Sequence, residues 1–408
     1  MLLLRNATAR VTAWPLWGDR AVRASCAPLV LLRSPSAAAA SLYTGPRRAT
    51  PEQKLNRLLI DATRARGVLA LHRVHGESFD DVNLATCWSK LGRASPSDRR
   101  WLHRSEGARK LSALREQTSR QLRTLRPREL AITAQALAKL DLRDPAWGGF
   151  WKELEGVVLA RQRSDFSPQA LSNTACAFAT AGHATHALMD SVVEECAERV
   201  GEFKPFELAV TAWALATAGH AAPALFDAIE TACDGRVRGL SPQAMANAVW
   251  AFATASHAAP ALFNAFGGGI ERQVHNLTPQ HLSKTAWAFA TAGHAAPMLL
   301  DAIARDLADK VSELTAQELA NLAWAFAESD HLMLDSSLFD QRFARCCDVL
   351  ADEFSVEALC QLHQWRLWYA GDRAGSEGLP GDALLARCEA AFRDANSAPP
   401  DAAGVTGL

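Results

Sequence analysis

One stretch of the sequence recurs five times at a fixed interval of 37 residues. Its most visible mark is a Trp or a Cys, found at Cys176, Trp213, Trp250, Trp287 and Trp324. The text around each mark is nearly the same, and in the third copy it reads LSPQAMANAVWAFATASHAAP over residues 240–260. A period of about 20 to 50 residues is typical of solenoids, whose units bury their apolar faces only by stacking. The repeat therefore predicts a stacked array.

Each copy contains the start and stop signals of two helices. A hydroxyl that can cap the first helix, helix A, stands at Ser167, Ser241, Thr278 and Thr315. Residues suited to the left-handed end of helix A follow at Gly182, Gly219, Gly293, Ser256 and Ser329. A proline opens the second helix, helix B, at Pro223, Pro260 and Pro297. No stretch alternates with the period of a strand, so the predicted fold is an all-α solenoid of helical hairpins.

The repeat pattern divides the chain into five segments. We expect an organelle transit peptide (1–50), basic divergent helical repeats (51–165), five regular repeats (166–331), C-terminal capping helices (332–395) and a disordered tail (396–408). Text like helix A recurs at 83–92 and 130–140, and again at 357–368, where a short helix from Gly381 to Phe392 should follow. The run Gly267 to Gly269 lies inside a helix B pattern and predicts a break or a lengthened turn.

Charge differs strongly between the two halves of the chain. Residues 1–163 hold 29 Lys and Arg against 14 Asp and Glu, whereas residues 166–331 hold 8 against 17. The first fifty residues contain seven arginines and one acid, Asp19, which is typical of a transit peptide. We therefore expect the mitochondrial matrix, with the plastid as the alternative. No run of 18 apolar residues predicts a membrane span, and the nine scattered cysteines fit a reducing compartment.

The repeated unit Leu-Ser-Pro-Gln-x-Leu-x-Asn-x-x-Trp-Ala-Phe-Ala resembles the octotricopeptide repeat of algal organelle proteins. It also resembles the related heptatricopeptide arrays and the leader region of FAST-kinase-like proteins, and residues 359–365 are similar to the segment that precedes a RAP domain there. The resemblance covers about residues 80–392 and implies an organellar RNA-binding solenoid that acts in RNA processing, stability or translation. The chain ends at Leu408, so we expect no RAP domain and no nuclease-like role associated with one.

A polar stripe runs along helix A, beside the apolar side that faces helix B. In successive copies it comprises Gln169, Asn173, Cys176, Thr180; Gln243, Asn247, Trp250, Thr254; Gln280, Lys284, Trp287, Thr291; and Gln317, Asn321, Trp324, Glu328. Stacking would align these side chains along the concave face, where helical-repeat proteins read splayed RNA bases. The second position varies most (Asn173, Val210, Asn247, Lys284, Asn321), as expected of a base-selecting position. The alternative is that the amides cap helices or bond between repeats.

Three other groups of residues have both a structural and a functional interpretation. The tryptophans could stack on bases, but wedging between repeats is the preferred prediction. The histidines that follow helix A (His183, His220, His257, His294, His331) are one repeat apart, too far to share a metal, and we expect helix-end contacts. The basic stretch from Arg93 to Arg128 could grip RNA phosphates, with Arg115, Arg120 and Arg123 as candidates, or could be a solvated helical face.

No catalytic constellation and no cofactor motif stands out, so the sequence predicts neither an enzyme nor a cofactor. The expected function is to bind single-stranded organellar RNA, either mRNA or rRNA, and the further expected partners are ribonucleoprotein or mitoribosomal proteins. The rival hypothesis is a protein-interaction scaffold within an organellar assembly such as the mitoribosome, because solenoids bind proteins as readily as RNA and the regular repeats are acidic.

Overall fold

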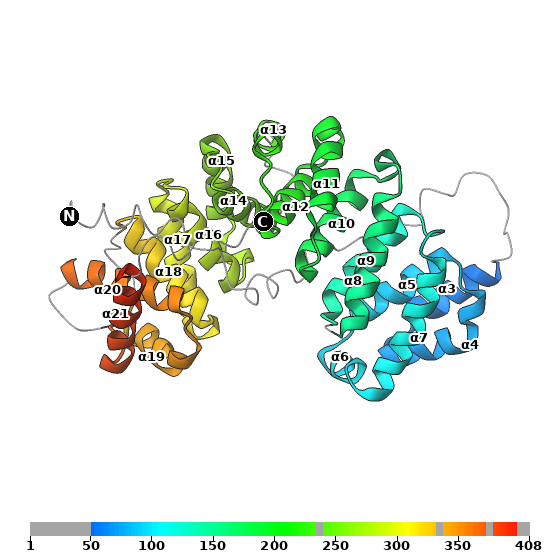
Figure 1. The fold of residues 1–408 in the computed structure, drawn as a ribbon. Helices are drawn as coiled ribbons and strands as arrows, with labels where there is room; N and C mark the ends of the chain where they lie inside the picture. Colours follow the sequence, from blue (N-terminus) through cyan, green and yellow to red (C-terminus); the bar gives the residue numbers. More distant parts are fainter. Residues whose placement is uncertain (1–49, 143, 234–239, 332–337, 373–377, 398–408) are drawn as a thin grey trace. The chain divides into compact units, whose positions relative to one another are not determined.

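The computed structural model describes residues 50–142, 144–233, 240–331, 338–372 and 378–397 (Figure 1). Throughout these residues the chain is helical without strands, and successive hairpins stack, which confirms the predicted solenoid class. The expected transit peptide and the expected tail lie almost wholly outside the described residues. The chain divides into two compact units, one ending at Ala222 and the other beginning at Pro223.

The first unit is built from two layers of helices. Its elements are α3 (Pro51–Asp61), α4 (Ala65–His75), α5 (Asp81–Gly92), α6 (Pro96–Leu102), α7 (Ser105–Gln121), α8 (Pro127–Leu140), α9 (Pro145–Leu159), α10 (Pro168–Ala181), α11 (His186–Glu198) and α12 (Pro205–Thr217). The A helices α5, α8, α10 and α12 pack side by side in this order, and α7, α9 and α11 form the B layer behind them. The hairpin of α3 and α4, which lies within the expected divergent repeats (51–165), packs against α5.

The second unit repeats the same arrangement. It comprises α13 (Pro223–Cys233), α14 (Pro242–Thr254), α15 (Pro260–Glu271), α16 (Pro279–Thr291), α17 (Pro297–Leu307), α18 (Ala316–Glu328), α19 (Gln341–Val349), α20 (Val356–Asp372) and α21 (Asp382–Ser397). The A helices α14, α16, α18 and α20 again pack side by side, each backed by its own helix B. The last helix, α21, extends beyond the expected end at Phe392.

The predicted helix starts are confirmed by hydrogen bonds. The hydroxyl groups of Ser167, Ser241, Thr278 and Thr315 each accept from the backbone N–H three residues later, at 3.2 to 3.4 Å. Positive φ angles follow helix A at Gly182, Gly219, Gly293, Ser256 and Asp330. Ser329 was therefore the wrong residue, because its φ is −76° and Asp330 keeps the register of six residues after the repeated Trp or Cys.

Small residues allow close packing between neighbouring helices. In the second unit, the Ser283 hydroxyl on α16 donates to the Glu318 carbonyl oxygen on α18 at 2.7 Å. The expected break at Gly267 to Gly269 is wrong, because α15 continues through it. A Cβ atom at Gly267 would lie 3.1 Å from the ring of Phe289, so the glycine serves a close helix approach rather than a turn.

Among the described residues, no helix combines the length and the apolar character needed to cross a bilayer.

Candidate nucleic-acid interface

The polar stripe keeps its register on the A helices, but its members differ in exposure. The first position is exposed at Gln169 and partly exposed at Gln243, Gln280 and Gln317. The second position has little exposed surface: the fractions are 3% for Asn173, 6% for Asn247, 7% for Lys284 and 1% for Asn321. The A helices α10, α14, α16 and α18 therefore each present a reachable amide near the start and a nearly covered polar group one turn later.

At the last two A helices the stripe amides bond to one another. Gln317 Nε2 on α18 donates to Asn321 Oδ1 at 3.0 Å and lies 3.3 Å from Gln361 Oε1 on α20. The Ser355 hydroxyl closes the set by donating to Gln317 Oε1 at 3.4 Å. At this end of the array the amides therefore bond between repeats, which was the alternative to base recognition.

Two amides of the stripe keep an unused donor. The Nδ2 atoms of Asn247 on α14 and Asn321 on α18 are buried and have no hydrogen-bond partner among the described residues. The two residues occupy the same helix position in different repeats. A buried donor without an acceptor costs about 1 to 3 kcal/mol, so a ligand that supplies an acceptor there would recover this energy.

The tryptophans have mostly low exposure. Trp213, Trp250 and Trp287 are 3%, 3% and 8% exposed, whereas Trp324 is partly exposed. The low exposure agrees with packing rather than with open stacking platforms, and wedging between repeats stays a prediction. In the terminal repeat, Trp368 Nε1 donates to Asp330 Oδ1 at 3.0 Å, which links α20 to the end of α18.

The repeated histidines join each repeat to the one before it. The backbone N–H of each donates to the carbonyl five residues earlier, which closes the end of helix A as expected. The imidazole of four of them reaches back 30 residues to the preceding helix B: Nε2 lies 3.1 Å from Asp190 in His220, 3.0 Å from Asp227 in His257, 3.1 Å from Asn264 in His294 and 2.8 Å from Asp301 in His331. These side chains are inter-repeat links, which the spacing alone did not reveal.

The predicted phosphate contacts Arg115, Arg120 and Arg123 do not lie on the helices that carry the stripe. Arg115 and Arg120 belong to α7 in the B layer, and Arg123 follows this helix. The Arg115 guanidinium lies 5.2 Å from the centre of the Trp147 ring, whereas Arg120 and Arg123 are exposed. The structure therefore separates these cations from the amides Gln169 and Asn173 of the same unit.

A different group of cations does lie on the A layer, at the C-terminal ends of α5 and α8. It consists of Arg93, Arg99 and Lys139, which we call the basic cluster. Arg93 directly follows α5, and Lys139 lies in the last turn of α8. Arg99 reaches back from α6 to the carbonyl oxygens of Gly92 and Ala94, at 3.4 and 3.2 Å. None of the three makes an ion pair with a carboxylate within the described part of the chain.

Lys139 was not among the site residues predicted from the sequence, although the repeat register indicates its position. Lys139 occupies on α8 the place that Thr180 has on α10, and Arg93 occupies the same place after α5. Burial and the neighbouring cations Arg93 and Arg99 lower the pKa of Lys139. The positively charged groups of Arg93, Arg99 and Lys139 therefore lie close enough to repel one another at the end of the stripe.

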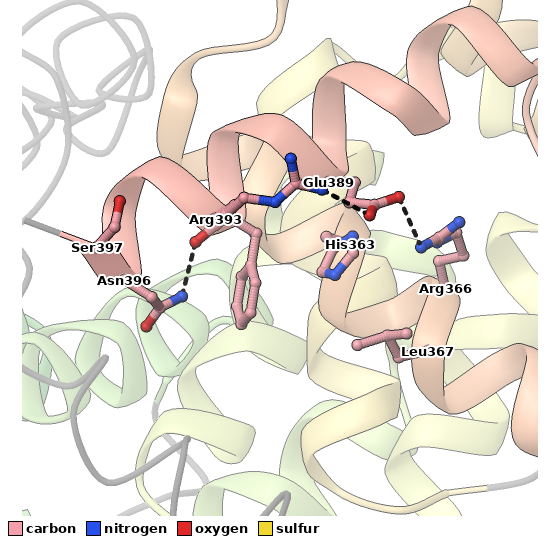
Figure 2. Close-up of a pocket in the computed structure, with 8 residues that line it drawn as sticks. His363, Arg366, Leu367, Glu389, Arg393, Asn396 and Ser397 are labelled. Atoms are coloured by element: carbon pink, nitrogen blue, oxygen red, sulfur yellow. Dashed lines mark hydrogen bonds and ion pairs between the residues drawn. The ribbon is translucent and has the colours of Figure 1, made fainter.

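A hollow of about 530 Å³ lies apart from the stripe, between α20 and α21 (Figure 2). Figure 2 shows Glu389 between Arg393 and Arg366, with ion-pair distances of 2.9 and 3.8 Å. His363 stacks on Phe392 with ring centres 4.7 Å apart, and burial lowers the pKa of His363. Because a carboxylate already bridges the two guanidinium groups, this hollow is a poorer phosphate site than the basic cluster.

The described residues offer little for metal or thiol chemistry. No group of three or more His, Cys, Asp and Glu side chains in them is placed to hold a metal ion. Burial raises the pKa of the thiols of Cys87, Cys196 and Cys347 well above the usual range. These thiols therefore stay protonated at neutral pH and are poor nucleophiles.

Comparison with known proteins assigns the chain to no family. No protein-family model matches the chain, and no curated protein matches it significantly.

Proposed function

We propose that this protein binds single-stranded organellar RNA and acts in its processing, stability or translation. The observation that carries the proposal is the unused amide donor at the same helix position in α14 and α18, at Asn247 and Asn321. An RNA base offers carbonyl and ring-nitrogen acceptors on its edges, and helical-repeat proteins read single-stranded bases with one side chain or a few from each repeat. These two donors lie two repeats apart and have almost no exposed surface, so they are suited to bases two repeats apart that displace the side chains covering them on binding.

Two further observations support RNA over other ligands. The second stripe position changes its chemistry from repeat to repeat (Asn173, Val210, Asn247, Lys284, Asn321), which would give each repeat its own preference. The basic cluster places cations on the A layer of the first unit. Contacts between these cations and RNA phosphates would add affinity that does not depend on the base sequence. The resemblance of the repeat text to organellar RNA-binding arrays points the same way.

A second candidate function is a scaffold that binds a basic protein. It is favoured by the exposed carboxylates on the B helices, because the side chains of Asp190, Asp227 and Asp301 keep 63%, 72% and 42% of their surface although each lies beside a histidine. Within the second unit, the exposed carboxylates of Asp227 and Asp301 can attract a positively charged partner. The two functions use different layers of the helical array and can therefore be separated by mutation.

Ultraviolet crosslinking of the full chain in isolated mitochondria, followed by sequencing of the attached RNA, tests the proposal. We expect crosslinked organellar mRNA or rRNA, with crosslinked peptides from the A helices. A matched variant, Asn247→Ala with Asn321→Ala, should shift the recovered sequences while it leaves the total yield nearly unchanged. Absence of crosslinked RNA, or recovery of basic proteins through the B helices, would favour the scaffold instead.

A further inference from the structure

The basic cluster of Arg93, Arg99 and Lys139 has the geometry of a binding site for backbone phosphates. Helices α5 and α8 approach so closely that a Cβ atom on Gly92 would lie 2.9 Å from the Cα atom of Ala136. Arg93 is the next residue after Gly92, and Lys139 lies one turn after Ala136. The close helix contact therefore brings the two cations to the same edge of the A layer.

Arg99 completes the cluster from a third helix. Its guanidinium donates to the carbonyl oxygens of Gly92 and Ala94, so the side chain is held over the end of α5 rather than left to move freely. The nearest acid along α6, Asp98, is itself only 6% exposed, and its Oδ2 accepts from the Ser95 hydroxyl at 3.1 Å. The positive charge of the cluster is thus not cancelled by a carboxylate bonded to it.

The chemistry of the cluster selects a phosphate over other ligands. Guanidinium groups match the oxygens of a phosphate with paired N–H donors, and an ammonium group adds a point charge. The three cations also repel one another, and this repulsion is relieved when an anion binds between them. Arg126 differs in this respect, because it is already paired with Asp81 and Glu129 at 2.9 and 3.2 Å.

We propose that Arg93, Arg99 and Lys139 form the main phosphate-binding site of the A layer and hold the backbone of bound single-stranded RNA beside α8 and the stripe of α10. This inference rests on the proposed function for its natural ligand. The basic cluster takes the place of Arg115, Arg120 and Arg123 as the main group of phosphate contacts, because those residues lie on or after α7 in the other layer.

The test compares two charge-neutralising double variants of the full chain. Arg93→Gln with Lys139→Gln removes two cations of the cluster, and Arg109→Gln with Arg120→Gln removes two exposed cations of α7 with the same change in net charge. Each protein is titrated into a labelled single-stranded RNA of mixed sequence at two or more salt concentrations. Circular dichroism checks that both variants keep their helices.

We expect the cluster variant to bind RNA about 20-fold more weakly near 0.1 M salt and to lower the slope of log affinity against log salt by about 1.4, since each lost phosphate contact on a single strand removes about 0.7. The α7 variant should change both quantities much less. An equal or larger loss in the α7 variant, or an unchanged slope in the cluster variant, would overturn the site while leaving RNA binding intact.

A second ligand tests the phosphate site independently of RNA binding. Inorganic tripolyphosphate offers the same phosphate groups without bases, and millimolar concentrations should raise the melting temperature of the unmodified chain and of the α7 variant but not of the cluster variant. If RNA fails to bind while this selective shift is seen, the proposed function is wrong and the phosphate site stands. If tripolyphosphate shifts all three proteins alike, or none of them, the site is refuted.

Discussion

In the A layer, the contact of α5 with α8 in the first unit differs chemically from the contact of α18 with α20 in the second. In the first unit, Arg93 and Lys139 lie at the end of the stripe without carboxylate partners, and Gly92 lets their helices approach closely. In the second, Gln317 bridges Asn321 and Gln361 at 3.0 and 3.3 Å, so the polar groups bond to one another. One repeat scaffold thus supports a surface poised for an anion and a surface that fastens neighbouring repeats.

This contrast teaches that a repeated position does not have a repeated role. Backbone geometry fixes where a side chain of helix A lies, whereas the residues placed beside it decide whether it is available to a ligand. The amide ladder is therefore better regarded as a set of positions, some used for stability and some left for binding.

The apolar contact between repeats should dominate stability in the second unit. Phe252 on α14 is fully buried, and its ring centre lies 4.9 Å from that of Phe226 on α13. Phe252→Ala should lower the free energy of unfolding by about 3 to 5 kcal/mol, because a buried aromatic ring leaves a cavity. Urea denaturation followed by circular dichroism measures the loss. Met298→Ala, at a side chain 61% exposed, is the control and should cost little.

Acid should weaken the second unit through His281, near the start of α16. Burial, with help from the Lys284 cation, lowers the pKa of His281 to about 4, so the folded chain favours the neutral ring. The unfolded chain takes up the proton below its ordinary pKa of about 6.5, and stability present above that pH is lost as the pH falls from 6.5 to 4.

The loss through His281 should amount to roughly 2 to 3 kcal/mol over this window. His281→Gln should flatten the dependence of the melting temperature on pH, whereas His275→Gln, at an exposed histidine, should leave it unchanged. Equal pH dependence in all three proteins would show that His281 is not the acid-sensitive group.

The close approach of α5 and α8 should be intolerant of a methyl group. Gly92→Ala places Cβ 2.9 Å from the Ala136 backbone, and we expect a cost of about 1 to 3 kcal/mol together with weaker RNA binding, because Arg93 and Lys139 move apart. Gly148→Ala on α9 is the matched control, since no atom lies within 4 Å of its added Cβ. That variant should be neutral or slightly stabilising, as expected for Gly to Ala in a helix. Equal melting temperatures for the two variants would contradict the close contact.

The amide bridge at α18 and α20 should contribute least. Gln317→Ala removes the bonds to Asn321 and Gln361, and we expect a loss of about 0.5 to 1.5 kcal/mol in stability with no change in RNA affinity. Gln169→Ala, at the exposed equivalent position on α10, should show the opposite pattern, with unchanged stability and altered RNA preference. A loss of RNA binding in the Gln317 variant would mean that the bridging amide also faces the ligand.

Local signals in the sequence predicted most of the fold. Capping hydroxyls such as Ser167 and prolines such as Pro260 act within one turn of their own helix. These helix starts could therefore be predicted correctly from the sequence. The error at Gly267 arose because a residue distant in the sequence, Phe289, packs against it. The error at Ser329 was avoidable, since the register of six residues after the repeated Trp or Cys selects Asp330.

The candidate site was less predictable because it depends on contacts between helices. The amides were found from their spacing, but which of them bond to each other depends on the next repeat, as at Gln361. The basic stretch was found by charge, yet only the packing of α5 on α8 distinguishes Arg93 and Lys139 from Arg120. The reach of His257 back to Asp227 likewise links two helices 30 residues apart in the sequence.

Hydrogen–deuterium exchange of the full chain, with and without a saturating single-stranded RNA, tests the central claim most directly, because it reports which layer meets the ligand. We expect slower exchange of backbone amides at the ends of α5 and α8, over residues 88–94 and 136–142, and in the A helices that carry Asn247 and Asn321. Peptides from the B helices α13, α15 and α17 should be unchanged. Protection confined to those B helices, or no protection anywhere, would contradict an RNA-binding A layer.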